Sequence, residues 1–178
     1  VMLQRPQCEA TLAAPRDIDW LTWEGDASPV DCVPVKATDP LYVLYTSGTT
    51  GKPKGIVRDN GGHAVALNYS MSAVYGVGVG DVYWAASDVG WVVGHSYIVY
   101  GPLFAGCTTV LYEGKPVKTP DAGAFWRVLA DHKVKSFFVA PTAFRAMRKE
   151  DPDCELLKQY DISNLEYQFV AGERLDPP

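Results

Sequence analysis

Short apolar segments alternate with helix-length segments along most of this chain, and this alternation constrains its fold more than any other feature. The apolar segments, rich in Val, Thr, Tyr and Phe, have the length of strands: residues 82–86, 107–112, 136–140 and 166–171. Segments with helical spacing lie between them, of which the first is apolar enough to be buried: residues 96–104, 119–133 and 142–149. Strands that alternate with helices pair in parallel, so the sequence predicts an α/β fold with a largely parallel or mixed sheet and packed helices.

The first half of the chain adds a different pattern. Residues 41–45 form a continuous apolar and aromatic run, which is typical of a buried strand, and residues 56–58 indicate a second strand. A helix is expected over residues 63–75. Further along, Thr119-Pro120-Asp121 combines a capping residue, a first-turn proline and a first-turn acid, so we expect a helix to begin there.

Composition separates an irregular leading segment from the rest of the chain. Residues 1–40 are rich in Pro and Asp, and we expect them to form an irregular approach segment to the lobe formed by residues 41–178. The chain opens at Val1 without a charged and then apolar leader. It ends at Asp176-Pro177-Pro178, which is typical of an interrupted turn or helix start. We therefore expect both ends to be cut from a longer polypeptide.

Composition and charge exclude several classes of protein. Hydrophobic residues make up 47% of the 178 residues and charged residues 21%, which excludes disorder and coiled coil. A net charge of −5 argues against a nucleic-acid partner. No apolar run reaches the roughly 18 residues of a membrane span. The cysteines are far apart, which argues against a zinc site and a disulfide scaffold and favours a reducing compartment: Cys8, Cys32, Cys107 and Cys154. We expect the cytoplasm, or the mitochondrial matrix if the source is eukaryotic.

A glycine- and threonine-rich loop, TSGTTGKPKG at residues 46–55, follows the first predicted strand. Glycines and hydroxyl groups let backbone N–H groups converge on phosphate oxygens, and two lysines add positive charge. The alternative is a hairpin loop with two solvated lysines. The loop is not a Walker A motif, because only two residues separate Gly48 from Gly51 and Pro53 follows Lys52. We interpret it as a phosphate-binding loop.

This loop resembles the AMP-binding signature of the adenylate-forming superfamily, which includes acyl-CoA synthetases, luciferases and peptide-synthetase adenylation domains. Further motifs follow in the order found in short-chain acyl-CoA synthetases: DVGWVVGHSY at 88–97, YEG at 112–114, APTA at 140–143 and AGE at 171–173. The resemblance spans roughly residues 42–176. Arg58-Asp59 and the Val-Ala-Gly-Glu sequence at 170–173 resemble propionyl-CoA synthetases more than acetyl-CoA synthetases.

The resemblance implies a partial N-terminal domain of an acyl-CoA synthetase, with residues 41–178 as an incomplete AMP-binding lobe. The implied reaction joins a short-chain carboxylate, propionate by preference, to AMP from ATP and then to CoA, with Mg²⁺ as the ion that accompanies ATP. The loop would hold the β- and γ-phosphates through a set of eight residues: Thr46, Ser47, Gly48, Thr49, Thr50, Gly51, Lys52 and Lys54.

The resemblance also implies positions for the other substrates. The acyl group would lie against Trp91, Val92, Val93 and Ala171. CoA would approach Val93 and Ala140, and adenine would contact the segment Gly172, Glu173 and Arg174. Arg174 stands where the family usually has proline, which leaves the adenine contact of that turn open. The alternative for Trp91 is a core residue, and the alternative for Thr142 is a simple helix cap.

No catalytic residue and no metal ligand is assigned within the chain. By resemblance, the motifs for magnesium, ribose and the adenylation lysine, and the C-terminal domain, would follow this chain. Its partners would then be the carboxylate, ATP, CoA and the remainder of the parent polypeptide, with neither nucleic acid nor membrane. A rival interpretation is a non-catalytic nucleotide- or acyl-binding module on the same scaffold.

Overall fold

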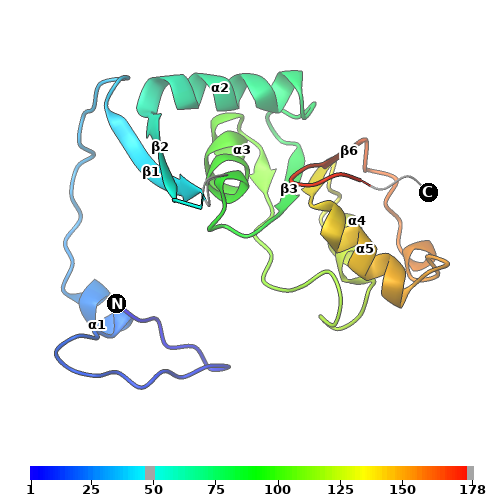
Figure 1. Ribbon diagram of the computed structural model, residues 1–178, viewed down its shortest axis with the longest axis horizontal. Helices are drawn as coiled ribbons and strands as arrows, with labels where there is room; N and C mark the ends of the chain where they lie inside the picture. Colours follow the sequence, from blue (N-terminus) through cyan, green and yellow to red (C-terminus); the bar gives the residue numbers. More distant parts are fainter. Residues whose placement is uncertain (47–50, 176–178) are drawn as a thin grey trace. The chain divides into compact units, whose positions relative to one another are not determined.

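The computed structural model describes residues 1–46 and 51–175, and the chain divides into two compact units, Val1–Val35 and Lys36–Pro178. The first unit is irregular apart from one short helix, α1 (Trp20–Gly25), which is drawn in blue in Figure 1. The Asp19 carboxylate caps this helix by accepting the Thr22 N–H. The boundary expected between residues 40 and 41 stays a prediction.

The second unit begins with an antiparallel pair of strands, β1 (Pro40–Thr46) and β2 (Lys54–Asp59), in which Val43 lies opposite Val57. Both strands were predicted, and both are confirmed. The expectation that the first is buried is wrong, because 51% of Val43 and 69% of Tyr45 is exposed. Among the described strands β1 pairs only with β2, so it lies at the edge of a two-stranded ribbon rather than inside a larger sheet.

Helix α2 (Asn60–Ala73) follows β2 directly (Figure 1). It begins three residues before the predicted start, because the Asp59 carboxylate accepts the Gly62 N–H at 3.2 Å and caps a first turn that contains two glycines. Its buried side chains are His63, Leu67 and Met71, spaced four residues apart on one face.

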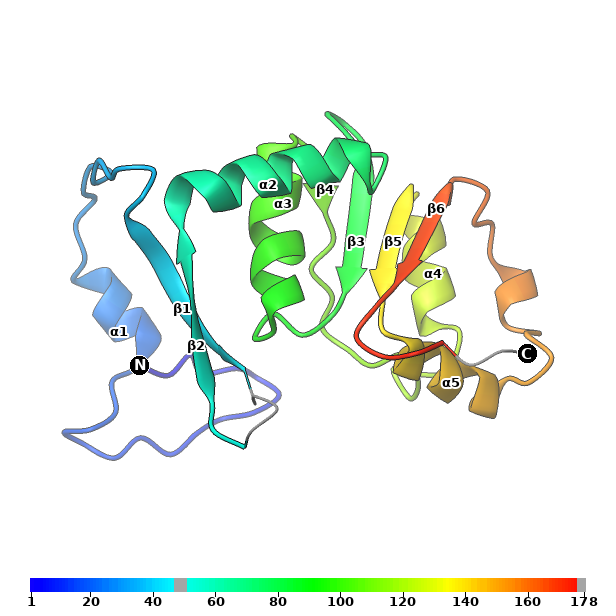
Figure 2. The same ribbon diagram turned by 45° about the horizontal axis from the view of Figure 1, so that its top comes forward.

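The main sheet has the strand order β4-β3-β5-β6, and every pair in it is parallel (Figure 2). Its strands are β3 (Val82–Ala86), β4 (Thr108–Thr109), β5 (Ser136–Val139) and β6 (Tyr167–Val170). The predicted α/β class with a parallel sheet is confirmed. Strand β4 is shorter than predicted, because only Thr108 and Thr109 pair with β3.

Helices connect successive strands of the sheet. The segment after β3 forms a π-helix, η1 (Gly94–Tyr100), which continues into α3 (Gly101–Phe104). Helix α4 (Ala124–Asp131) precedes β5, and α5 (Pro141–Glu150) follows it, with a 3₁₀ turn η2 (Leu157–Gln159) before β6. The expected burial of the segment before β4 is only partly correct, because 62% of Leu103 and 50% of Phe104 is exposed. No helix in the two described stretches of the chain has the length and apolarity needed to cross a membrane.

The predicted start of α4 is wrong by several residues. The Thr119 hydroxyl accepts the Lys115 N–H at 3.1 Å instead of capping a helix. The Asp121 carboxylate accepts the Gly123 N–H at 2.8 Å. Both side chains therefore stabilise a turn before the helix, so the regular helix begins only at Ala124.

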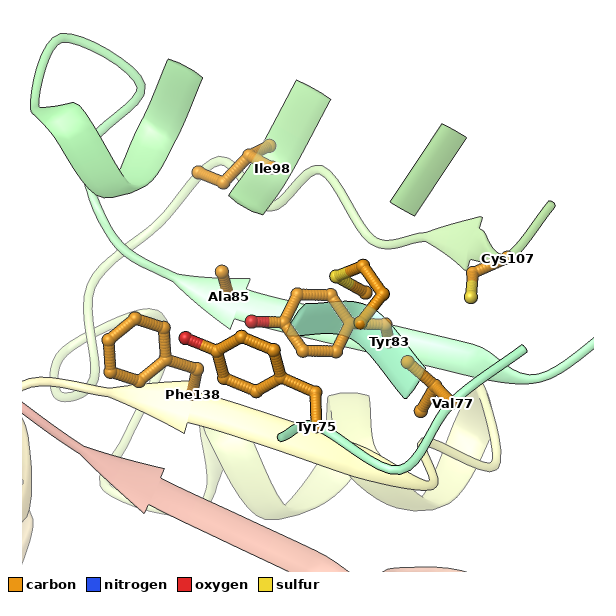
Figure 3. Packing of buried hydrophobic residues seen from close by; sticks show 8 residues of the cluster. Tyr75, Val77, Tyr83, Ala85, Ile98, Cys107 and Phe138 are labelled. Carbon is orange, nitrogen blue, oxygen red and sulfur yellow. The ribbon is translucent and has the colours of Figure 1, made fainter. Parts of the chain in front are cut away.

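Two apolar clusters cover the two faces of the main sheet. Tyr83 of β3 and Phe138 of β5 belong to the cluster packed against Tyr75 (Figure 3). Trp84 and Phe137, the next residue of β3 and the preceding residue of β5, belong to the other cluster. Successive residues of a strand point to opposite faces, so β3 and β5 are buried on both sides. This rigid double-sided core fixes where the strands end.

Candidate functional site

The strands β3, β5 and β6 run in parallel, so their carboxyl ends lie at one edge of the sheet (Figure 2). The predicted acyl, CoA and adenine residues lie on segments that follow these ends: 87–93 after β3, Ala140 after β5 and 171–174 after β6. Ligands of open α/β sheets bind outside the carboxyl ends of the strands. This edge is therefore the candidate site.

A small cavity of about 40 Å³ lies at this edge. It is lined by Ser87, Val93, Phe138, Val139, Ala140 and Ala171. The structure thus brings together Val93, Ala140 and Ala171, three residues from segments that lie far apart in the sequence. Their roles toward acyl group and CoA stay predictions.

Two other residues of the predicted acyl pocket do not line the cavity. Trp91 is 68% exposed and Val92 is 37% exposed. The alternative that Trp91 is a core residue is therefore wrong. The segment that carries Trp91 and Val92 begins with a turn at Asp88. The Asp88 carboxylate stabilises this turn by accepting the Gly90 N–H at 2.7 Å. A Cβ at Gly94 would lie 2.4 Å from Val89 Cα, so only glycine fits where η1 begins.

The predicted phosphate loop lies only partly within the described residues. Ser47, Gly48, Thr49 and Thr50 lie outside them, and Thr46 ends β1. Gly51 has φ +77°, a left-handed conformation that favours glycine. Both lysines are exposed, and Lys54 is the first residue of β2. The phosphate role of the loop stays a prediction.

The predicted adenine segment makes polar contacts with the first turns of α5. Glu173 Oε1 accepts the Thr142 N–H at 2.8 Å and also the Thr142 hydroxyl. Arg145 Nη1 donates to Glu173 Oε2 at 2.8 Å, and Nη2 donates to the carbonyl of Arg174 at 2.6 Å. The Thr142 hydroxyl, followed by the Arg145 guanidinium, lowers the pKa of the Glu173 carboxyl. We call these four residues the α5 clasp.

Arg145 was not predicted as a site residue. It lies 28 residues before Glu173, and its spacing of three residues from Thr142 is only that of neighbours on one helix face. A contact between a helix and a loop beyond the next strand leaves no local sequence signal. The sequence showed only that an arginine and a threonine lie together at the start of a helix that follows a buried strand.

Larger cavities also lie on the second unit, and one of them is lined by Ser87, Asp88 and Val89 of the segment after β3. One of about 320 Å³ lies against α4 and α5, and one of about 410 Å³ adjoins Trp84 and Tyr112. None of the predicted site residues lines either of them. Within residues 1–46 and 51–175, no three His, Cys, Asp or Glu side chains are grouped so that they could hold a metal ion.

A model of the AMP-binding enzyme family matches residues 3–178. The chain belongs to the AMP-binding enzymes. An uncharacterized protein of Pseudomonas aeruginosa is 64% identical to it over 173 residues, which cover 97% of this chain and 28% of that protein. The human acyl-CoA synthetase short-chain family member 3, mitochondrial, is 59% identical over 177 residues, covering 99% of this chain and 26% of the human protein.

A third similar protein is the acetyl-coenzyme A synthetase of Novosphingobium aromaticivorans. It is 44% identical over 179 residues, covering 99% of this chain and 27% of that synthetase. The chain therefore spans only a little more than a quarter of the length of the relatives that it matches.

Proposed function

We propose that this chain is the part of an ATP-dependent short-chain acyl-CoA synthetase that carries its acyl cavity and its phosphate loop. One observation carries the proposal: Val93, Ala140 and Ala171 meet in a small cavity at the carboxyl edge of a parallel sheet. The names of two relatives, which describe a short-chain acyl-CoA synthetase and an acetyl-coenzyme A synthetase, support the same reaction class.

The proposed reaction has two steps. A carboxylate oxygen attacks the α-phosphorus of ATP, and pyrophosphate leaves with the bonding electron pair, which gives an acyl adenylate. The CoA sulfur then attacks the acyl carbon, AMP leaves, and the thiol proton passes to solvent. Mg²⁺ bound to the ATP phosphates would supply counter-charge. Such a reaction depends mainly on positioning and on charge stabilisation.

Each part of the chain has a proposed task in these steps. Lys52 and Lys54 would face the pyrophosphate as negative charge develops on it. The cavity would hold the alkyl end of the carboxylate, with Ala140 at its border toward CoA. The segment 172–174 would contact adenine. Figure 2 shows that this segment leaves the red strand β6 at the same edge as the segments after β3 and β5.

We also propose that the carboxylate is propionate. The cavity is small, about 40 Å³, and Val93 and Ala171 give it apolar walls. Burial of one more methylene than acetate offers is worth about 0.8 kcal/mol. The compartment is proposed to be the cytoplasm or the mitochondrial matrix, in keeping with four free thiols.

The complete protein that contains this chain is expected to convert propionate, ATP and CoA into propionyl-CoA, AMP and pyrophosphate in equal amounts. The 178-residue chain alone is expected to show no turnover above a buffer control, because it spans about a quarter of its relatives. Chromatography of the nucleotides and thioesters checks both statements. A complete protein that binds ATP without any turnover would instead support the non-catalytic module.

Replacing Ala171 by valine is expected to lower the preference for propionate over acetate on the order of tens-fold in kcat/KM. A valine side chain would occupy part of a cavity of about 40 Å³, and one methylene is worth about 1–3 kcal/mol in such discrimination. Initial rates of the complete protein with both acids give the ratio. Ala73→Val, at an exposed residue of α2, is the control. An unchanged ratio would show that Ala171 does not shape the pocket.

A further inference from the structure

Helix α5 begins without a cap of its own. Ala140 occupies the N-cap position and has no side-chain acceptor, and Pro141 follows it. The N–H groups of the first turn of a helix need partners from outside the helix. Glu173 provides one, because its carboxylate accepts both the N–H and the hydroxyl of Thr142. A negative charge at a helix N-terminus is also favourable to the helix dipole.

Arg145 completes the contact from the next turn of α5. Its guanidinium donates through one nitrogen to the Glu173 carboxylate and through another to the backbone carbonyl of Arg174. A planar guanidinium can make two such bonds at once, whereas a lysine ammonium acts as a single point charge. The segment after β6 is therefore held both by a side chain and by its backbone. The Arg145 and Glu173 side chains are each 39% exposed, so solvent reaches the clasp.

The clasp joins two walls of the small cavity. Ala140 lies two residues before Thr142, and Ala171 lies two residues before Glu173. Both alanines line the cavity, and neither carries a group that could hold its neighbour in place. The parallel pairing of Val139 with Val170 already places these walls side by side, and the bonds between Thr142, Arg145 and Glu173 hold the segments that continue beyond this pair. Both Glu173 oxygens accept bonds from α5, so the clasp engages the Glu173 carboxylate within the chain itself.

We propose that Arg145 is a positioning residue, which holds the segment 171–174 in the orientation that both the nucleotide and the acyl group require. This proposal rests on the proposed function of that segment. Arg145 need not touch either substrate, because it acts through Glu173 and through the carbonyl of Arg174. Loss of Arg145 removes the bonds to Glu173 Oε2 and to the Arg174 carbonyl, and leaves the segment that follows β6 attached to α5 through Thr142 alone among the residues of the clasp.

Arg145→Met in the complete protein is expected to raise the KM for ATP about 5- to 20-fold and to weaken the propionate preference, as loss of a partly exposed charge-assisted pair implies. Arg148→Met is the matched control, since Arg148 is an exposed arginine one turn further along α5 and outside the clasp. Arg145→Lys retains the positive charge but lacks the planar guanidinium that donates through two nitrogens at once. It should therefore restore the KM for ATP only in part.

A pH titration of the 178-residue chain tests the clasp without reference to activity. Arg145 and Thr142 hold the pKa of the Glu173 carboxyl below its ordinary value of 4.5. The stabilisation is therefore present at neutral pH and is lost as pH falls through the lowered pKa. Arg145→Met should move the pKa of Glu173, followed by carbon-13 NMR, up toward the ordinary value, whereas Arg148→Met should not.

The outcomes separate the two proposals. An unchanged KM for ATP in an active Arg145→Met enzyme would overturn the positioning role and leave the proposed function in place. An unchanged pKa of Glu173 in the same variant would overturn the contact between Arg145 and Glu173, and with it the positioning role. A wild-type complete protein without carboxylate-dependent turnover would overturn the proposed function, and the positioning role with it.

Discussion

Adenylate formation by the complete protein is expected to slow about 30-fold to 1,000-fold when Lys52 is replaced by alanine, which corresponds to about 2–4 kcal/mol of transition-state stabilisation. Lys52 is exposed and directly follows Gly51, whose positive φ turns the chain before β2. Within residues 1–46 and 51–175 the Lys52 ammonium has no bonded partner, so the change should act on the bound phosphates rather than on stability.

The two half-reactions should respond differently to this change. Pyrophosphate has left before CoA attacks, so Lys52→Ala should leave thioester formation from supplied propionyl adenylate within about twofold of wild type. Rapid-quench measurement of each half-reaction gives the two rates. Lys149→Ala, at an exposed lysine in the last turn of α5, is the control for loss of one positive charge. Equal damage to both half-reactions would contradict the phosphate role of the loop.

Replacing Trp84 by alanine is expected to lower the free energy of unfolding of the chain by about 3–5 kcal/mol. Trp84 is fully buried at the centre of β3, and its ring lies 4.9 Å from the rings of both Phe125 and Phe137. Its indole Nε1 is buried without a hydrogen-bond partner among the described residues, so the native side chain already bears a desolvation penalty. The loss should therefore fall toward the lower end of that range.

Urea unfolding followed by circular dichroism measures this effect on the chain itself. Domains of this kind have a total stability of about 5–15 kcal/mol, so the Trp84 variant should unfold at a clearly lower urea concentration. Trp23→Ala provides the control, because Trp23 lies in the first unit and is 52% exposed. Equal unfolding midpoints for the two variants would show that Trp84 does not anchor the core between the sheet and α4.

The parallel sheet could be predicted from the sequence because its signals are local. Segments such as 82–86 and 136–140 are short and apolar and lie between turns, and the structure confirms them as β3 and β5. Burial depends on distant partners, so the apolar run of β1 gave no indication that Tyr45 is exposed. The start of α4 was mispredicted for a related reason, since Thr119 uses its hydroxyl in a turn with Lys115.

The candidate site could be predicted only where family motifs mark it. These motifs led to Val93, Ala140 and Ala171, which the fold then brings into one cavity. Arg145 belongs to no motif, and its bonds to Glu173 and Arg174 arise only because β6 lies beside β5. Such contacts follow from the order of strands in the sheet, which a single sequence does not state.

The central claim is that this chain belongs to an enzyme that activates a short-chain carboxylate as its adenylate. Exchange of labelled pyrophosphate into ATP, measured with the complete protein in the absence of CoA, tests that claim most directly. We expect exchange that requires a carboxylate and is faster with propionate than with acetate. A folded protein that binds ATP but catalyses no exchange with either acid would contradict it.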